Sequence, residues 1–252
     1  MTNSIDNKWN KIFFSLGICF IFIFWLILSL IINNEYAMPK LGSATNALAD
    51  LLKTKNTYVI LGRTILKIAL TIILALSVSI VLVSLSTLSK KFRAFISPII
   101  ALLKTIPVVV VILLFLFLFT RNTTPIFVAL LVIMPLMYEA LLNGINNIDQ
   151  TIIEETKMLS KTNLFVFRKV YFPLTKPYII LAILQSIGLG LKSMVMAELI
   201  AQSENSIGKE MSEYRSFLDM NYIFAWGLLM IVIVLISEIL IRILKKKITM
   251  NV

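Results

Sequence analysis

Six long apolar runs, separated by short polar segments, constrain this chain more than any other feature of its sequence. We place them at residues 12–32, 59–88, 98–119, 125–142, 177–202 and 222–244. Each is close to the roughly 20 residues that a helix needs to cross about 30 Å of hydrocarbon. Apolar residues make up 59% of the chain and charged residues 15%, unlike a water-soluble domain. The sequence therefore predicts an all-α integral membrane protein with six transmembrane helices.

The first apolar run and the basic residues predict the orientation in the membrane. The run at residues 12–32 is too long for a signal-peptide core and lacks a following cleavage site, so we expect it to stay as an anchor. Placing both termini in the cytoplasm puts about 14 basic residues inside and about 6 outside, as the positive-inside rule requires. Residues 143–176 then form a cytoplasmic loop and residues 203–221 an outer loop.

Residues that carry chemistry are scarce. The chain has no histidine and a single cysteine, Cys19, within the first apolar run. A disulfide framework and the usual imidazole or thiolate metal sites are therefore excluded. No G-x-x-x-x-G-K-[ST] phosphate loop occurs, so the chain cannot hydrolyse ATP by itself. We expect no catalytic residue, no metal site and no cofactor-binding residue.

The loop at residues 143–176 is long enough to hold local structure. Thr151 and Glu154 have the spacing of a capping box, which predicts a short helix from about Ile152. A second helix is expected to begin at Thr162 or Asn163 and to end at Pro173. It would present an apolar set to a partner, made of Leu164, Phe165, Phe167, Val170 and Tyr171. The alternative is that the loop packs against its own bundle.

The spacing within this loop matches a known signature. The segment reads Glu154-Glu155-Thr156, three residues, Ser160, nine residues, and Val170-Tyr171-Phe172-Pro173. It resembles the E-A-A-x3-G-x9-I-x-L-P motif of binding-protein-dependent ABC importer permeases. In that family the motif forms a coupling helix that sits in a cleft of the ATPase subunit. The resemblance carries that role onto Glu154, Glu155, Thr156, Leu159, Ser160, Val170 and Pro173. Ser160 replaces the motif glycine, so the turn can differ in detail.

The resemblance extends from about Gly62 to Lys246, a region similar to permeases of the nitrate, sulfonate and taurine group. Three short segments carry it: Gly62-Arg63-Thr64, Met196-Ala197-Glu198-Leu199 and Ser206-Ile207-Gly208. It implies a type I ABC importer permease (MetI-like) fold over residues 59–246, with the coupling loop at 143–176. Residues 1–58 would be an anchor helix and outer loop, and residues 247–252 a cytoplasmic tail. The group's Pro-Leu and Trp-Phe-Gly stretch is replaced here by residues 108–119, which leaves the substrate open.

The same resemblance implies a function and partners. ABC ATPase subunits would bind and hydrolyse ATP, and an extracytoplasmic solute-binding protein would deliver the solute. A second permease copy, giving a homodimer, would complete the path through the plasma membrane lipid, and no nucleic acid is expected. The chain would import a small organic anion or a vitamin precursor. The alternative is an ion-coupled secondary transporter or channel, which often has repeated halves, but we find no internal repeat.

Two groups of basic residues fall within the second and third runs, although a charge at the centre of a span costs about 2.5–3.5 kcal/mol. Arg63 and Lys67 lie near the outer end of the second run, where we expect them to reach the headgroups. Lys104 stands three residues before Pro107, which invites a bend. Lys104 either faces a solute path there or reaches the inner surface. We take Lys104 and Pro107 as possible path residues.

Two further ionisable residues, Lys192 and Glu198, lie in the fifth run. They are six residues apart and therefore do not share a helix face. Each either pairs with a residue on another helix, with Glu139 and Glu238 as possible partners, or serves as a gate. We add both to the possible path, and the ammonium of Lys192 favours an anionic solute.

Overall fold

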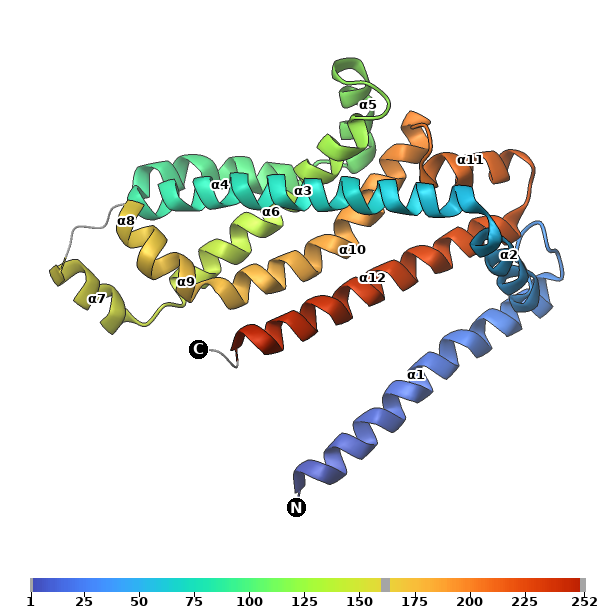
Figure 1. The fold of residues 1–252 in the computed structure, drawn as a ribbon, viewed down its shortest axis with the longest axis horizontal. Coiled ribbons are helices and arrows are strands. Elements are labelled where there is room, and N and C mark those ends of the chain that lie inside the picture. Colours follow the sequence, from blue (N-terminus) through green and yellow to red (C-terminus); the bar gives the residue numbers. More distant parts are fainter. Residues whose placement is uncertain (1, 160–163, 250–252) are drawn as a thin grey trace. The chain divides into compact units, whose positions relative to one another are not determined.

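The computed structural model describes residues 2–159 and 164–249, and over these ranges every regular element is a helix (Figure 1). The elements are α1 (Thr2–Ile32), α2 (Leu41–Lys53), α3 (Lys55–Leu88), α4 (Lys90–Thr105), α5 (Val108–Leu118), α6 (Thr124–Asn146), α7 (Gln150–Leu159), α8 (Leu164–Val166), the π-helical turn η1 (Phe167–Tyr171), α9 (Phe172–Leu174), α10 (Lys176–Ala201), α11 (Ile207–Ser216) and α12 (Met220–Thr249).

Five of the described helices are long and apolar enough to cross a membrane. Their qualifying segments are Ser15–Ile32, Lys55–Leu88, Thr124–Asn146, Lys176–Ala201 and Met220–Ile241. The bent pair α4 and α5 makes a sixth if it is counted as one span. The predicted class, an all-helical membrane protein, is confirmed.

The third apolar run is not the continuous helix that we expected over residues 98–119. α4 and α5 meet at a bend of 101°. Ile106, which precedes Pro107, has an extended backbone with φ −65° and ψ 127°. The proline ring disfavours helical geometry at the residue before it, and its nitrogen has no proton to donate. Pro98, in contrast, lies inside α4 without ending it.

The chain divides into two compact units, one of which contains residues 1–57 and 211–229. In that unit the indole N–H of Trp25 donates to the carbonyl of Pro39 at 3.0 Å. The Trp25 ring also lies 5.3 Å from the ring of Phe224, and Tyr214 stacks on Tyr222 at 4.5 Å. Aromatic contacts of this kind fix the loops that follow α1 and precede α12.

The other unit contains residues 58–210 and 230–252. Here α6 and α10 pack side by side (Figure 1). Ile133 and Met137 of α6 and Met194 of α10 are wholly buried between the helices. At Gly190 an added Cβ would lie 2.9 Å from Ile68 and 3.3 Å from Ile133. The glycine thus allows α3, α6 and α10 to approach closely, as small residues do in membrane bundles.

Hydroxyl groups add directional contacts between α3 and α6. Ser79 donates from Oγ to the Met134 carbonyl at 3.1 Å, and Ser86 Oγ lies 3.0 Å from the Tyr138 hydroxyl. Side-chain hydrogen bonds between membrane helices contribute about 0.6 kcal/mol each on average. They fix the register of these two helices while the surrounding apolar side chains supply the packing.

Candidate translocation and coupling site

Lys104, in the last turn of α4, forms an ion pair with Glu139 of α6. Its Nζ lies 2.9 Å from Oε1 and 2.8 Å from Oε2 of the carboxylate. Both side chains are about half exposed, at 49% and 42%. This pairing with another helix was not among the environments expected for Lys104, which were a solute path and the inner surface. Glu139 is therefore not the partner of Lys192 or Glu198.

A cavity of about 340 Å³ lies beside this ion pair. Apart from Lys104 and Glu139, its lining is apolar and comes from α4, α5, α6 and α10, including Val111, Leu136 and Leu189. Val108, the first residue of α5 after the Pro107 break, also lines it. The cavity thus combines one charged wall with apolar walls.

A single stripe of α10 is exposed along its membrane-spanning part. Between residues 178 and 201 the exposed positions are Leu181, Gln185, Leu189, Lys192 and Met196. Steps of three and four residues place them on one helix face. Gln185 and Lys192 would be costly to turn toward lipid tails, so this face should meet water or another protein chain. Among the described residues Lys192 has no ion-pair partner, and the pairing considered for it is not found.

Glu198 is paired, but with Lys67 of α3 rather than with Glu139 or Glu238. Lys67 Nζ lies 2.9 Å from Glu198 Oε1, and the Glu198 side chain is wholly buried. Lys67 was expected to reach the headgroups, and this is wrong because its side chain is only 19% exposed. A buried carboxylate needs a cation close to it, since an unpaired charge in the bundle is costly to keep.

The C-terminal end of α10 brings Glu198 against Gly208, which belong to two of the three segments that carry the family resemblance. The Gly208 N–H donates to Glu198 Oε2 at 3.5 Å. A Cβ at Gly208 would lie 2.3 Å from the backbone nitrogen of Leu199. α10 ends at Ala201, and the next residue, Gln202, has a left-handed backbone with φ 53°. This conformation reverses the chain direction, so that the following loop packs against the end of the helix.

Asn122, which no pattern in the sequence singled out, holds together the region at the C-terminal end of α10. Its Oδ1 accepts from the Glu204 N–H at 2.9 Å and from Ser203 Oγ at 3.1 Å. These bonds join the turn between α5 and α6 to the end of α10. An asparagine in a turn is a common residue, so no signal in the sequence marked this contact.

The loop at residues 143–176 contains α7, but the expected capping box is wrong. α7 begins at Gln150, and Asp149 rather than Thr151 caps it. Asp149 Oδ1 accepts from the Thr151 N–H at 3.0 Å and from the Thr151 hydroxyl at 2.8 Å. Both hydrogen bonds lower the pKa of Asp149 below its ordinary value, and the one from the Thr151 backbone N–H has the larger effect. Aspartate is among the strongest N-cap residues, and it lies two positions before Thr151.

α7 places the motif acids on the outside of the loop. Glu154, Glu155 and Met158 are exposed, Met158 by 85%. Thr156 turns its hydroxyl back to the Ile152 carbonyl at 2.6 Å. Ile152, on the other side, packs against the bundle core. Leu159 is the last residue of α7, and Ser160 lies outside the described residues, as do the expected helix starts Thr162 and Asn163.

The second part of the loop divides its apolar residues between two environments. Phe165 is 68% exposed, whereas Phe167 and Tyr171 are buried in the core formed with α3, α4, α6 and α10. Val170 is partly buried against the same core. Our expectation that Phe167 and Tyr171 face a partner is therefore wrong, because the bundle itself covers them. Phe165 remains free of that core.

Pro173 does not end the second helical segment, which continues to Leu174 in α9. The preceding turn is π-helical, and the Phe172 N–H donates to the Phe167 carbonyl five residues earlier. A proline inside an α-helix clashes with the carbonyl four residues before it. The wider π turn of η1 relieves this clash, and such turns often occur at functional positions.

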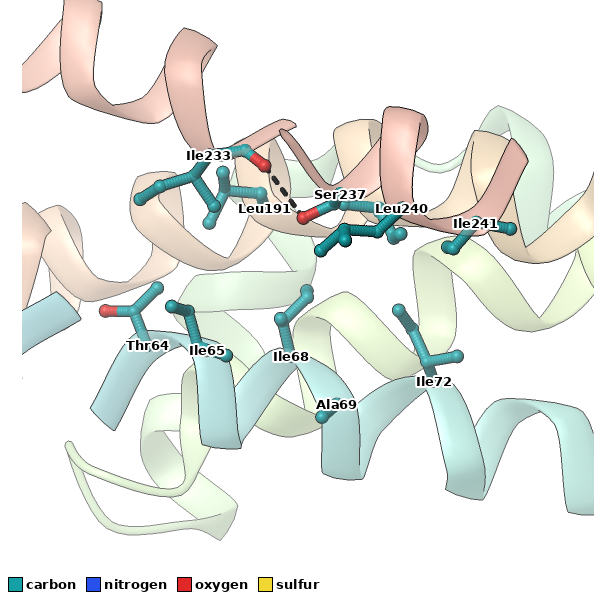
Figure 2. Close-up of a pocket in the computed structure, with 11 residues that line it drawn as sticks. Thr64, Ile65, Ile68, Ala69, Ile72, Leu191, Ile233, Ser237, Leu240 and Ile241 are labelled. Atoms are coloured by element: carbon teal, nitrogen blue, oxygen red, sulfur yellow. Dashed lines mark hydrogen bonds between the residues drawn. The ribbon is translucent and has the colours of Figure 1, made fainter. Parts of the chain in front are cut away.

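A second cavity, of about 250 Å³, lies between α3, α10 and α12 (Figure 2). Isoleucines dominate its lining, among them Ile68 of α3 and Ile233 of α12. Figure 2 shows the Ser237 hydroxyl turned to the Ile233 carbonyl, at 2.7 Å. The buried hydroxyl of Thr64, which also lines this cavity, has no hydrogen-bond partner. Because none of the lining residues is charged, the cavity offers little to a charged solute, unlike the cavity beside Lys104.

The fold has membrane-length helices, an exposed stripe on α10 that contains Lys192, and a helical loop between two spans. These features are typical of a polytopic membrane transport protein. A family model described as binding-protein-dependent transport system inner membrane component matches residues 83–250. The chain belongs to this family, the permeases of ABC importers. Family membership favours this class over an ion-coupled carrier or channel and makes the chain a transport subunit.

The chain is also similar to a protein of Bacillus subtilis (strain 168) that is named as an aliphatic sulfonates transport permease, SsuC. The two are 25% identical over 185 residues, which cover 73% of this chain and 66% of the relative. The chain thus spans just under two thirds of the length of the curated relative it matches. This similarity supports the sulfonate group of permeases, as the sequence motifs do.

Proposed function

We propose that this chain is the permease subunit of an ABC importer that carries a small organic anion across the plasma membrane. The observation that carries the proposal is the exposed stripe of α10, where Gln185 and Lys192 lie in the middle of a membrane-length helix. Lys192 stands about 14 Å from the outer end of α10, at about 1.5 Å per residue. A water-filled path is the environment that keeps such groups charged.

One chain offers only one wall of such a path. A second copy that faces the first would bring two α10 stripes together and enclose the polar positions between them. This is the homodimer implied by the family resemblance. Symmetric pairs are the commonest oligomers, and charged side chains in spans almost always face the interior of an assembly.

The substrate class follows from charge. Glu139 neutralises Lys104 and Glu198 neutralises Lys67, so Lys192 is the cation that leaves the path positive. A solute with a sulfonate or carboxylate group complements this charge. The name of the Bacillus subtilis relative, which refers to aliphatic sulfonates, agrees with that class.

Coupling to ATP is assigned to α7 and the segment after it. Met158, Phe165 and the two acids Glu154 and Glu155 offer a mixed apolar and charged surface, which suits docking in a cleft. Ile152 and Val170 pack against the core of the bundle, so movement of this surface would be passed to the spans. ATPase subunits would bind and hydrolyse ATP, and the motif residues Thr156, Leu159, Ser160 and Pro173 belong to the same segment.

If α7 and the segment after it dock to the ATPase, the orientation of the chain in the membrane follows. The loop at residues 143–176 and both termini face the cytoplasm, and the outer loop that follows α10 receives the solute from an extracytoplasmic binding protein. Asn122, Ser203 and Glu204 then lie at the receiving side, where their hydrogen bonds keep the loop in place.

The test is uptake into proteoliposomes that hold the permease with its ATPase, supplied with the binding protein and radiolabelled butanesulfonate. Uptake should require ATP. In a Cys19→Ser background, a membrane-impermeant thiol reagent should block uptake by the Met196→Cys variant, which places the thiol on the exposed stripe of α10 and keeps Lys192. The matched control is Leu66→Cys, an exposed position in an apolar part of α3. Uptake that continues without the ATPase, or equal block of both variants, would contradict the proposal.

A further inference from the structure

We propose that the cavity beside Lys104 is an anion subsite of the path, and that Glu139 occupies it until a solute anion takes its place. This inference rests on the proposed function and adds a site to it. In the resting state the carboxylate of Glu139 is bound by Lys104 through both of its oxygens, at 2.9 and 2.8 Å. A sulfonate or carboxylate of a solute presents oxygens of the same kind to the same ammonium.

Two ion pairs between described helices, Lys67–Glu198 and Lys104–Glu139, differ in their exposure, and this difference distinguishes a binding role from a structural one. The Lys67–Glu198 pair is closed, with side-chain exposures of 19% and 0%. The Lys104–Glu139 pair is open, with exposures of 49% and 42%. A pair that serves only to join helices has no reason to stay accessible inside a membrane, where exposed charge needs water. The open pair can exchange its anion, and the closed pair cannot.

The broken span supplies a second feature of an anion site. α4 ends directly after Lys104, and α5 begins at Val108, which lines the cavity. The N-terminal end of a helix carries a partial positive charge. Transporters commonly place such helix ends, exposed by a broken span, at their substrate sites. At this break the ammonium of Lys104 and the positive end of α5 line the same cavity.

The walls of the cavity suit the rest of a small amphiphilic anion. Its volume of about 340 Å³ falls at the lower end of the range for ligand pockets, about 300–1,000 Å³. Val111, Leu136 and Leu189 provide apolar surface for a short alkyl chain. Leu189 belongs to the exposed stripe of α10 and precedes Lys192 by three residues, so the two lie on one helix face. An anion could therefore pass between Lys104 and Lys192 along adjoining surfaces.

If Glu139 and a solute anion compete for Lys104, substitutions of Glu139 and of Lys104 should change anion affinity in opposite directions. In Glu139→Gln the competing charge is lost while the shape is kept, so Lys104 is free and a solute anion should bind more tightly. In Lys104→Gln the carboxylate of Glu139 remains without its cation and should repel the anion. A pair that only stabilises the fold would instead lower stability in both single variants, and the double variant would recover it.

The experiment measures binding of sodium butanesulfonate to the purified permease through the shift of its thermal unfolding midpoint, with sodium chloride at equal ionic strength as the reference. Compared with wild type, Glu139→Gln should lower the dissociation constant about tenfold and Lys104→Gln should raise it about tenfold. The double variant has neither the cation nor the repelling carboxylate, so it should bind butanesulfonate more tightly than Lys104→Gln and more weakly than Glu139→Gln. An unchanged dissociation constant in Glu139→Gln, or no butanesulfonate-dependent shift in any variant, would overturn the subsite.

ATP-dependent uptake by the wild type is measured in parallel, so the two proposals fail separately. If wild-type uptake depends on ATP while Glu139→Gln leaves binding unchanged, only the subsite is wrong. If Glu139→Gln binds more tightly but wild-type uptake does not need the ATPase, the importer function is wrong and the anion site stands.

Discussion

The Lys67 ammonium of α3 lies 2.9 Å from the Glu198 carboxylate of α10, and no part of that carboxylate reaches the surface. The two residues are 131 positions apart in the chain. The N–H of Gly208 supplies a further, longer contact to the same carboxylate. This cluster joins two spans to the start of α11, so we regard it as the structural anchor of the outer end of α10.

Removing the cation should leave Glu198 buried without its ion partner. We expect Lys67→Met to destabilise the permease by about 3–5 kcal/mol, the usual cost of breaking a buried pair. The Lys67→Met/Glu198→Met double variant should be more stable than the single variant, because no charge remains. Thermal unfolding in detergent measures both. Arg63→Met, at an exposed position of α3, is the control and should change little. Strictly additive effects would refute the coupling.

Gly208 should tolerate no side chain. A Cβ there would meet the Leu199 nitrogen at 2.3 Å and the Glu198 Cβ at 2.6 Å, and backbone cannot give way as a flexible side chain does. We expect Gly208→Ala to lower stability by about 3 kcal/mol, at the upper end of the range for overpacking. Gly62→Ala is the matched helical control, because nothing lies within 4 Å of its Cβ position. There alanine should stabilise by up to about 1 kcal/mol. A neutral Gly208→Ala would show that α11 can shift away.

Substitutions of two phenylalanines in the loop at residues 143–176 should distinguish effects on ATPase docking from effects on folding. Phe165 is 68% exposed and Phe167 is 4% exposed. Phe165→Ala should leave the unfolding temperature unchanged and reduce co-purification of the ATPase subunit about tenfold, the effect of losing roughly 1.4 kcal/mol at an interface. Phe167→Ala should instead cost about 3–5 kcal/mol of stability. If Phe165→Ala keeps full ATPase association, the docking surface does not include this side chain.

The cap of α7 should depend on pH. Hydrogen bonds from Thr151 lower the pKa of Asp149 below its ordinary value of 3.8. A carboxyl whose pKa is lowered on folding stabilises the folded state above its ordinary pKa. That contribution is lost as pH falls through the lower, folded value. Hydrogen exchange at the Thr151 amide, corrected for the intrinsic rate, should therefore speed up in acid below about pH 3.8. Asp149→Asn retains a cap without this titration, so it should show no such step.

The spans could be predicted from the sequence because burial in lipid acts on each helix separately. A run of about 20 apolar residues is sufficient to place it in the membrane. The coupling role proposed for residues 154–173 rests on local spacing, from Glu154 to Pro173, and on the family resemblance. Pro107 signalled a disturbance, but its 101° bend depends on how α5 packs against α6. The cap moved from Thr151 to Asp149 because Asp149 accepts from the Thr151 amide, which starts the helix two residues before the position that we expected.

The sequence by itself determined the class of this protein, since composition, helix length and motif spacing are properties of neighbouring residues. Only the tertiary structure decided which charges meet. It paired Lys67 with Glu198 and Lys104 with Glu139, left Lys192 on the exposed stripe, and buried Phe167 and Tyr171 under the bundle. Each outcome depends on which faces of separate helices pack together, and a charge inside a membrane finds its partner through that packing.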